Sequence, residues 1–220
     1  MKLNSKLLQL SAAGALALGA VSSAQAVATM TLFESVSNST VFITDNGVGD
    51  SSALTGVVLF AGSIGAFNVT VDTGMSKPVL GSATAPHMDL SFIANSTGPA
   101  NLTITFSDDG FTYTGSLTDA FGGTAGNNST VTNSVLKNGV QLIGQGPFTT
   151  GGFAATSSSF VSLLPQDILS LRVNIVTTGV GGVSSGDKDV FSAPDNGLTV
   201  SLLGSAMIGL IALRRKVRSA

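Results

Sequence analysis

The sequence from residue 101 to residue 113 reads Asn101-Leu102-Thr103-Ile104-Thr105-Phe106-Ser107-Asp108-Asp109-Gly110-Phe111-Thr112-Tyr113. Apolar side chains alternate with threonines over residues 102–106, and the alternation resumes at residue 111. Strict alternation is typical of a β-strand that has one buried and one solvated face. The Asp109-Gly110 pair between the two runs favours a tight turn, so this stretch predicts a β-hairpin.

The same alternation recurs along the rest of the chain, and no stretch between residues 27 and 192 has a convincing helical period. A second clear run of alternating apolar residues covers residues 169–175. Shorter runs bounded by Gly, Asn, Asp, Pro and Ser predict further strands at residues 30–36, 40–44, 56–61, 68–72, 88–94, 130–137 and 158–164. Stretches rich in glycine and serine predict long loops at residues 121–129, 144–152 and 179–186.

Nine or ten short strands of this kind predict an all-β fold, namely a single antiparallel β-sandwich or jelly-roll-like domain over residues 27–185. Absence of cysteine excludes disulfides and thiolate metal sites, so the domain depends on its own apolar core. The alternation predicts the side chains that face this core: Leu102, Ile104, Phe106, Phe111, Tyr113, Leu169, Leu171, Val173 and Ile175.

The charge of the chain is distributed unevenly. The whole sequence has ten basic and twelve acidic residues, a formal charge of −2. Residues 27–193 keep only four of the basic residues against eleven acidic ones, so this body carries a charge of −7. No basic patch is present to contact phosphates, which argues against a nucleic-acid partner.

The N-terminus has the three parts of a secretory signal peptide. Lys2 and Lys6 supply a positive segment, and residues 7–21 form an apolar segment. Ala24 and Ala26 flank Gln25 as a small-x-small cleavage site, which places the mature N-terminus at Val27. The predicted partners of residues 1–26 are therefore the secretion translocon and signal peptidase.

The C-terminus has a second three-part pattern. A turn-forming stretch, Pro194-Asp195-Asn196-Gly197, precedes an apolar segment at residues 198–213, and a basic cluster follows at residues 214–220. Sixteen helical residues span about 24 Å, which is short against a hydrocarbon core of about 30 Å. The segment predicts a short transmembrane helix whose basic cluster stays in the cytoplasm. That cluster consists of Arg214, Arg215, Lys216 and Arg218.

This C-terminal layout resembles the PEP-CTERM class of bacterial sorting signals, and most closely the variant written VPDSG or VPDGG. Ala193 stands where the variant has valine, and Asn196 stands where it has serine or glycine. The resemblance covers residues 193–218 and implies processing by an exosortase-like transpeptidase that cuts near the motif outside the membrane. Residues 186–197 are then predicted to be a spacer with the sorting motif. The alternative is a helix that anchors the protein permanently.

A second resemblance covers residues 40–120, which look like the body of uncharacterised secreted proteins that carry such tails. It rests on the stretches from Phe60 to Val71, from Gly74 to Gly81 and from Leu90 to Phe92, together with the strand that begins at Asn101. It supports the fold class and implies no activity.

Few residues in the body have the chemistry that catalysis needs. His87 is the only histidine, and a loop residue without a catalytic role is the commoner interpretation. Asp108-Asp109 and Asp187/Asp189 are the candidate carboxylate pairs for glycoside hydrolysis, although adjacent aspartates before a glycine are better explained as a turn. No cofactor is expected.

A calcium site is a weaker hypothesis. The stretch from Thr44 to Ser51 offers Asp45, Asn46 and Asp50 around two glycines, and Ca²⁺ prefers such oxygen ligands. An ordinary loop braced by its own aspartates is the default interpretation.

Together these patterns predict an exported, non-enzymatic protein of the envelope or extracellular matrix that is anchored transiently in the inner membrane and then sorted to the cell surface. The first alternative is a secreted module that binds carbohydrate, although the chain has no tryptophan and one tyrosine to stack on sugars. A hydrolase is the weakest hypothesis, because histidine and glutamate each occur only once.

Overall fold

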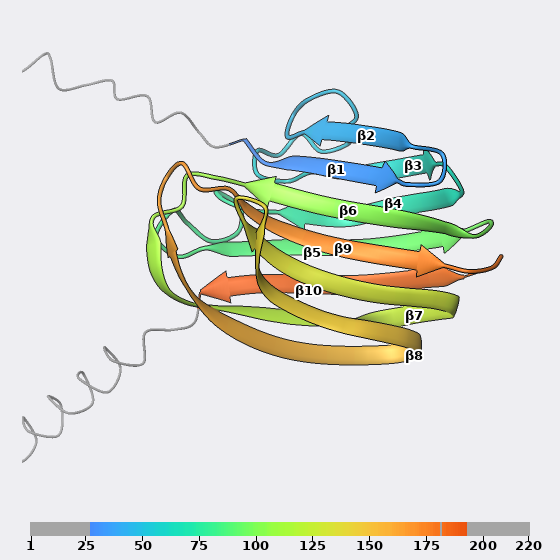
Figure 1. The fold of residues 1–220 in the computed structure, drawn as a ribbon. Helices are drawn as coiled ribbons and strands as arrows, with labels where there is room; N and C mark the ends of the chain where they lie inside the picture. Colours follow the sequence, from blue (N-terminus) through green and yellow to red (C-terminus); the bar gives the residue numbers. More distant parts are fainter. Residues whose placement is uncertain (1–26, 181, 193–220) are drawn as a thin grey trace, which may run out of the picture.

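The computed structural model describes residues 27–180 and 182–192, which form ten β-strands and no helix (Figure 1). Every pairing between these strands is antiparallel, which confirms the predicted all-β antiparallel class. The strands are β1 (Thr29–Glu34), β2 (Ser39–Thr44), β3 (Phe60–Ile64), β4 (Phe67–Met75), β5 (His87–Ser96), β6 (Ala100–Asp108), β7 (Tyr113–Lys137), β8 (Val140–Leu163), β9 (Leu169–Thr177) and β10 (Val183–Ser192).

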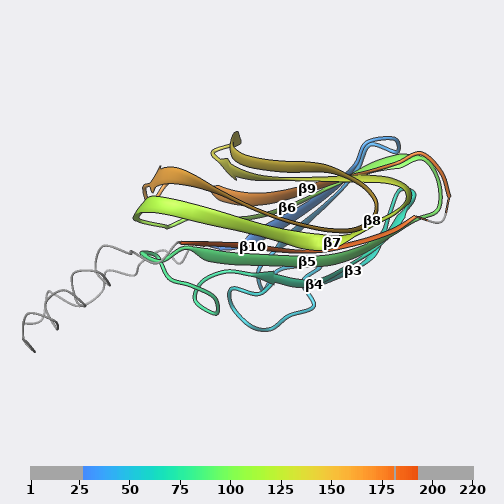
Figure 2. The ribbon, with the colours of Figure 1, turned by 90° about the horizontal axis from the view of Figure 1, so that it is seen from below.

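The strands form one sheet that folds over on itself into a β-sandwich (Figures 1 and 2). Their order is β2-β1-β6-β9-β7-β10-β5-β4-β3, and β8 pairs with β7. The layer of β2, β1, β6 and β9 faces the layer of β3, β4, β5 and β10. Gly74 of β4 shows how closely the layers pack, because a Cβ there would lie 2.8 Å from the Met30 side chain of β1 and 3.3 Å from Phe106 of β6.

The long strands β7 and β8 join the two layers. Residues 117–124 of β7 pair with β10, whereas residues 129–137 pair with β9 in the facing layer. The register of β7 against β8 shifts between Ala125 and Thr130, where Asn128 has a φ of 58°. Both strands therefore bend from one layer into the other, as Figure 1 shows.

A two-residue turn connects β7 to β8. Asn138 and Gly139 have φ values of 51° and 80°, as a type I′ turn requires, and Lys137 pairs with Val140 beside them. An Asn-Gly pair between alternating runs is a strong hairpin signal, although this hairpin was not among the sequence-based predictions.

The core predictions are confirmed. Eight of the nine residues expected to face the interior are buried, and Tyr113 is half-buried, with its hydroxyl donating a hydrogen bond to the Ser116 carbonyl. Buried phenylalanines supply the largest side chains of this core: Phe67, Phe92, Phe106, Phe111 and Phe121.

The predicted hairpin at residues 102–117 is wrong. Strand β6 pairs with β1 and β9, while β7 pairs with β8, β9 and β10, so the two runs are not neighbours. The connection between β6 and β7 is instead stabilised by residues from other parts of the chain. The Gly110 N–H donates a hydrogen bond to the Pro165 carbonyl, and Asp108 forms an ion pair with Lys77.

The predicted loops at residues 121–129 and 144–152 are wrong as well, since they lie inside β7 and β8. The predicted spacer that begins at residue 186 is wrong as far as Ser192, because β10 lies between β5 and β7.

Glycine is needed inside these strands where two backbones approach closely. A Cβ on Gly123, for example, would lie 2.1 Å from the Ser185 carbonyl oxygen. Strand β3 begins at Phe60, so the strand predicted at residues 56–61 overlaps it by only two residues.

A fully buried ion pair links β10 to β7 inside the sandwich. The Lys188 Nζ lies 2.6 Å from Oδ1 of Asp119, and both side chains are completely inaccessible to solvent. Burial raises the pKa of Asp119 and lowers that of Lys188, and in both residues it outweighs the attraction between the two charges. Burying the Lys188–Asp119 pair therefore costs solvation free energy that the attraction between the two charges does not fully offset.

Candidate functional site

The candidate calcium ligands Asp45, Asn46 and Asp50 lie in a loop whose backbone is hydrogen-bonded to the loop's own aspartates. The Asp45 carboxylate accepts hydrogen bonds from the Asn46 amide and, at 2.7 Å, from the Gly56 N–H. The Asp50 carboxylate accepts from the backbone N–H groups of Asn46, Ser52 and Leu59. The two carboxylates thus accept hydrogen bonds from backbone N–H groups of the connection between β2 and β3. This agrees with the default interpretation of an ordinary loop held by its own aspartates. Among the described residues, no group of three or more His, Asp or Glu side chains is arranged to hold a metal ion.

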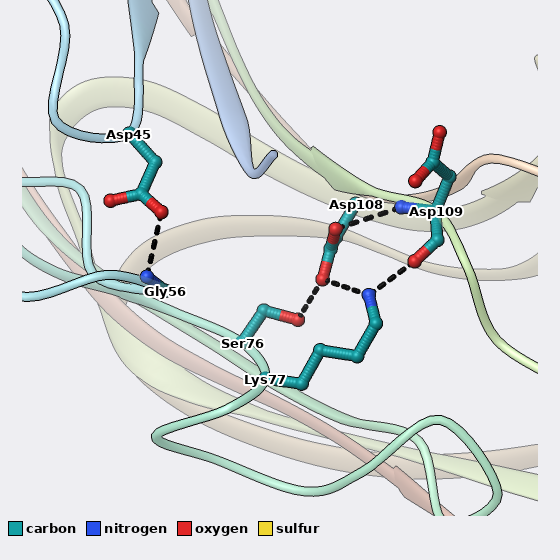
Figure 3. Close-up of polar contacts among 6 residues, drawn as sticks. All are labelled: Asp45, Gly56, Ser76, Lys77, Asp108 and Asp109. Carbon is teal, nitrogen blue, oxygen red and sulfur yellow. Dashed lines mark hydrogen bonds and ion pairs between the residues drawn. The ribbon is translucent and has the colours of Figure 1, made fainter. Parts of the chain in front are cut away.

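The candidate pair Asp108 and Asp109 also has a structural role (Figure 3). The buried Asp108 carboxylate accepts hydrogen bonds from the Ser76 hydroxyl at 2.6 Å and from Lys77 Nζ at 2.7 Å. Lys77 Nζ also donates to the Asp109 carbonyl and lies 4.1 Å from the centre of the Phe111 ring. The pair ties the end of β4 to the end of β6, and the Asp109 carboxylate points away from this cluster in Figure 3.

The other candidate residues come together on the outer face of the layer that contains β10. Alternation along β10 turns Lys188 inward and leaves Asp187 and Asp189 facing outward. Register then places Asp89 of β5 opposite Asp189, and His87 of β5 opposite Phe191. On the other side of β10, Gly122 and Ala120 of β7 stand opposite the two aspartates, so small side chains leave the carboxylates accessible.

Three adjoining hollows run over this face, and we call them together the acidic groove. Their volumes are about 500, 420 and 400 Å³. The first shares Asp187 with the second and Asp189 with the third, so the two aspartates lie at the centre of a continuous depression. The groove extends from Asp72 of β4 to Ala154 and Thr156 of β8.

The electrostatics of the groove depend on Asp89. Burial raises the pKa of Asp89 to about 6 against a hydrogen bond from the Thr73 hydroxyl, and the neighbouring Asp187 and Asp189 raise it further. Both of these aspartates act on Asp89 from the neighbouring strand β10. Asp189 in turn lies 2.6 Å from Nε2 of His87.

One exposed aromatic side chain lies on the same face. Phe160 of β8 is 73% exposed, and its partner in the register is Ser116 of β7, whose side chain also points outward. Phe191 is half-buried, and its ring centre lies 5.9 Å from that of His87. The face thus combines carboxylates and hydroxyls with apolar rings.

Sequence reasoning named His87, Asp187 and Asp189 without connecting them, and it missed Asp72, Thr73, Asp89 and Phe160. Asp89 falls at an alternate position of a predicted strand, next to the apolar Met88 and Leu90. An acid at such a position indicates a solvated outer face, and only the register of the strands shows what lies beside it. Several predicted features lie outside the described residues: the cleavage site Ala24/Ala26, the motif Pro194–Gly197, and the cluster Arg214, Arg215, Lys216 and Arg218.

Comparisons with known proteins assign the chain to no family. No family model matches it, and no curated protein matches it. A family 61 carbohydrate-binding module bound to β-1,4-galactotriose has a TM-score of 0.38 at 10% identity, covering 60% of this chain and 92% of the module. A family 35 module from Clostridium thermocellum has a TM-score of 0.32 at 15% identity, with coverage of 62% and 98%. The K1 adhesin domain of Lys-gingipain from Porphyromonas gingivalis scores 0.32 at 9% identity, with coverage of 62% and 98%.

By its fold and its candidate site, the protein is a β-sandwich with an open acidic groove on the outer face of one layer. The similarities above assign neither a ligand nor a site to this chain. Within residues 27–180 and 182–192, no helix is long and apolar enough to cross a membrane.

We expect Asp89→Asn to change how stability depends on pH. A raised pKa means that the folded state holds its proton more tightly than the unfolded state, whose carboxyl has a pKa of about 3.9. The wild-type protein should therefore lose stability relative to the variant as pH rises from about 4 to about 6. Melting temperatures of both proteins between pH 4 and pH 8 measure the difference, and a difference independent of pH would contradict the assignment.

Proposed function

We propose that the protein is an exported, non-catalytic module that binds a carbohydrate without acidic groups in the acidic groove. The observation that carries this proposal is the continuity of the three hollows around Asp187 and Asp189. Sugar hydroxyls both donate and accept hydrogen bonds, and the face offers carboxylate acceptors together with the hydroxyls of Ser91 and Thr156.

The shape and charge of the groove limit the ligand. It is open along its length, which suits a chain of several sugar units rather than one enclosed molecule. Asp72, Asp187 and Asp189 line it, and Asp89 lies opposite Asp189 on β5. The only basic side chain among the lining residues is that of His87. A uronic acid or a sulfated sugar would meet like charges here, so the ligand is neutral or carries amino groups. Phe160 and Phe191 provide apolar surface for the C–H faces of sugar rings.

A binding role fits the carboxylates better than glycoside hydrolysis does. Glycosidases hold two carboxyl groups about 5–9.5 Å apart so that the scissile bond, and in inverting enzymes a water, fits between them. Here the Asp89 carboxylate accepts a hydrogen bond from the Thr73 hydroxyl, and Asp189 lies 2.6 Å from Nε2 of His87. These neighbours orient the two carboxyl groups, and Asp187 is exposed beside them to accept hydrogen bonds from a ligand.

The double variant Asp187→Asn/Asp189→Asn is expected to lose binding. Hydrogen bonds to charged groups contribute about 1.5–3 kcal/mol each, so affinity should fall by at least about tenfold. Affinity electrophoresis of the full chain in gels that contain a neutral glucan, a neutral galactan, a partly deacetylated chitosan or a polygalacturonate measures this. Asp109→Asn is the control, because it removes one carboxylate charge from the connection between β6 and β7, outside the groove.

The result that supports the proposal is retardation in a neutral or amino-bearing gel that the double variant abolishes and the control preserves. Retardation in none of the gels, or retardation that the double variant keeps, would reject the groove. Release of reducing sugar that disappears in the double variant would instead show a hydrolase.

Export through the signal peptide and sorting through the C-terminal motif remain part of the proposal. They rest on the sequence patterns of residues 1–26 and 193–218.

A further inference from the structure

Within the part of the chain that the structure describes, the outer edge of β8 has no partner strand. Strand β8 pairs with β7 along its length, and among residues 27–180 and 182–192 no other strand pairs with it. The edge of a sheet presents unpaired backbone N–H and C=O groups, which form a template for a further strand. At 24 residues, β8 is four times as long as the edge strand β2, and the edge strand β3 has five residues.

This edge also lacks the usual protection against pairing. Natural edge strands carry charges, especially lysine, or prolines and bulges. No charged residue occurs between Lys137 and Asp167, so β8 is uncharged throughout. Pro147 interrupts its first half, whereas residues 151–163 contain neither proline nor a register shift against β7. The second half is therefore a regular, neutral edge of thirteen residues.

We propose that a second copy of this chain occupies this edge, with the two β8 strands antiparallel about a two-fold axis. An antiparallel pair is self-complementary, because the same backbone groups face each other on both sides of the axis. Length and charge together select this strand. The body carries −7, and pairing brings backbones within about 4.8 Å, so two copies meet without facing like charges along a neutral stretch. The edge strands β2 and β3 are neutral too, but at six and five residues they offer far fewer backbone groups than β8.

The pairing has a geometric consequence for the acidic groove. A two-fold axis between antiparallel strands stands perpendicular to the sheet, so the outer faces of both copies lie on the same side. Ala154 and Thr156, which line the groove, belong to β8 itself, so the two grooves adjoin across the new interface. The exposed Phe160 is covered in part by the second copy. Since both long edges are used, the assembly closes as a dimer rather than growing into a fibre.

Disulfide trapping of the full chain tests the dimer, because the natural sequence has no cysteine to interfere. Single cysteines are placed at each position from Ala154 to Phe160, because the two-fold axis can pass beside an outward-facing or an inward-facing residue. Thr118→Cys on β7 is the control one strand further in. A disulfide needs Cα atoms about 4.4–6.8 Å apart, which only residues near the two-fold axis satisfy. We expect mild oxidation in cells to trap a dimer that is most abundant at one β8 position and declines on either side of it. No trapped dimer at any β8 position, or as much at Thr118→Cys, would overturn the proposal.

A charge placed on the edge provides the second test. The hydroxyls of Ser158 and Thr118 lie 3.0 Å apart on the same face, so Ser158→Asp and Thr118→Asp remove the same hydrogen bond and add the same charge. Only Ser158 belongs to the edge strand. Introduced into the best-trapped cysteine variant, Ser158→Asp should reduce the dimer fraction several-fold and Thr118→Asp should not. Equal effects of the two changes would mean that the edge does not form the interface.

Discussion

Replacing Lys188 by methionine is expected to lower the free energy of unfolding by about 3–5 kcal/mol, because it leaves the buried Asp119 carboxylate without its counter-charge. The two side chains are fully inaccessible, so no water replaces the lost ammonium group. Urea denaturation of the full chain, followed by its β-sheet circular dichroism, measures the effect.

The matched control is Lys137→Met, which breaks the ion pair between Lys137 and Asp167. That lysine side chain is 29% exposed, and exposed pairs contribute at most about 1 kcal/mol. If Lys188→Met destabilises no more than Lys137→Met, the buried pair does not have the energetic role assigned to it.

Removing both charges of the Lys188–Asp119 pair should restore most of the free energy of unfolding that Lys188→Met loses. Burial shifts the pKa of each partner toward its neutral form, so the folded protein holds the charged pair at a net cost. The double variant Asp119→Leu/Lys188→Met is therefore expected to be more stable than Lys188→Met, and buried pairs in other proteins have been replaced at no cost in this way. A double variant as unstable as the single one would point to a loss of packing instead of an uncompensated charge.

The second large effect is expected at the sorting motif, which we propose as the processing site. Replacing Pro194 and Asp195 together by alanine should abolish removal of the C-terminus, while membrane insertion persists. Insertion depends on the apolar residues 198–213 and on the basic cluster, and carrying each of its charges through the bilayer centre would cost several kcal/mol. Mass spectrometry of the cell-surface fraction shows whether the final product ends before Leu198.

The fold gives this test a matched control. Strand β10 ends at Ser192, so a single residue separates the folded layer from Pro194. Phe191→Ala and Ser192→Ala change the neighbouring strand end and leave the motif intact, so processing should continue in both. An abundant peptide ending at Ala220 in the wild-type surface protein would show that the helix is a permanent anchor.

Sequence reasoning predicted the fold class because most strands bury one apolar face. In β6 and β9 the buried positions are occupied by Leu, Ile, Val and Phe, and these strands were placed correctly. Strand β10 was missed because its inward positions are Ser184, Gly186, Lys188 and Val190, of which only the last is a large apolar residue. Gly186 fits between aromatic rings, since a Cβ there would lie 2.8 Å from both Phe121 and Phe92. Composition alone gives such a strand the appearance of a linker.

The acidic groove was beyond prediction for a different reason. Its aspartates come from β4, β5 and β10, which are separated by up to about a hundred residues in the sequence. Asp187 and Asp189 were noticed as a pair, but Asp89 joins them only because β10 lies beside β5. Strand order in a large antiparallel sheet is set by the long-range packing of two layers, and local patterns do not encode it.

The central position of β10 determines how the domain responds to tension. Both neighbours of β10, strands β5 and β7, are hydrogen-bonded to it, and the described residues end at its last residue, Ser192. A force on the tail directed along β10 would load both ladders in shear, so many hydrogen bonds would have to break together. The first strand, β1, is likewise held between β2 and β6. A protein tethered by its C-terminus would thus be held by a strand that has a hydrogen-bonded neighbour on each side.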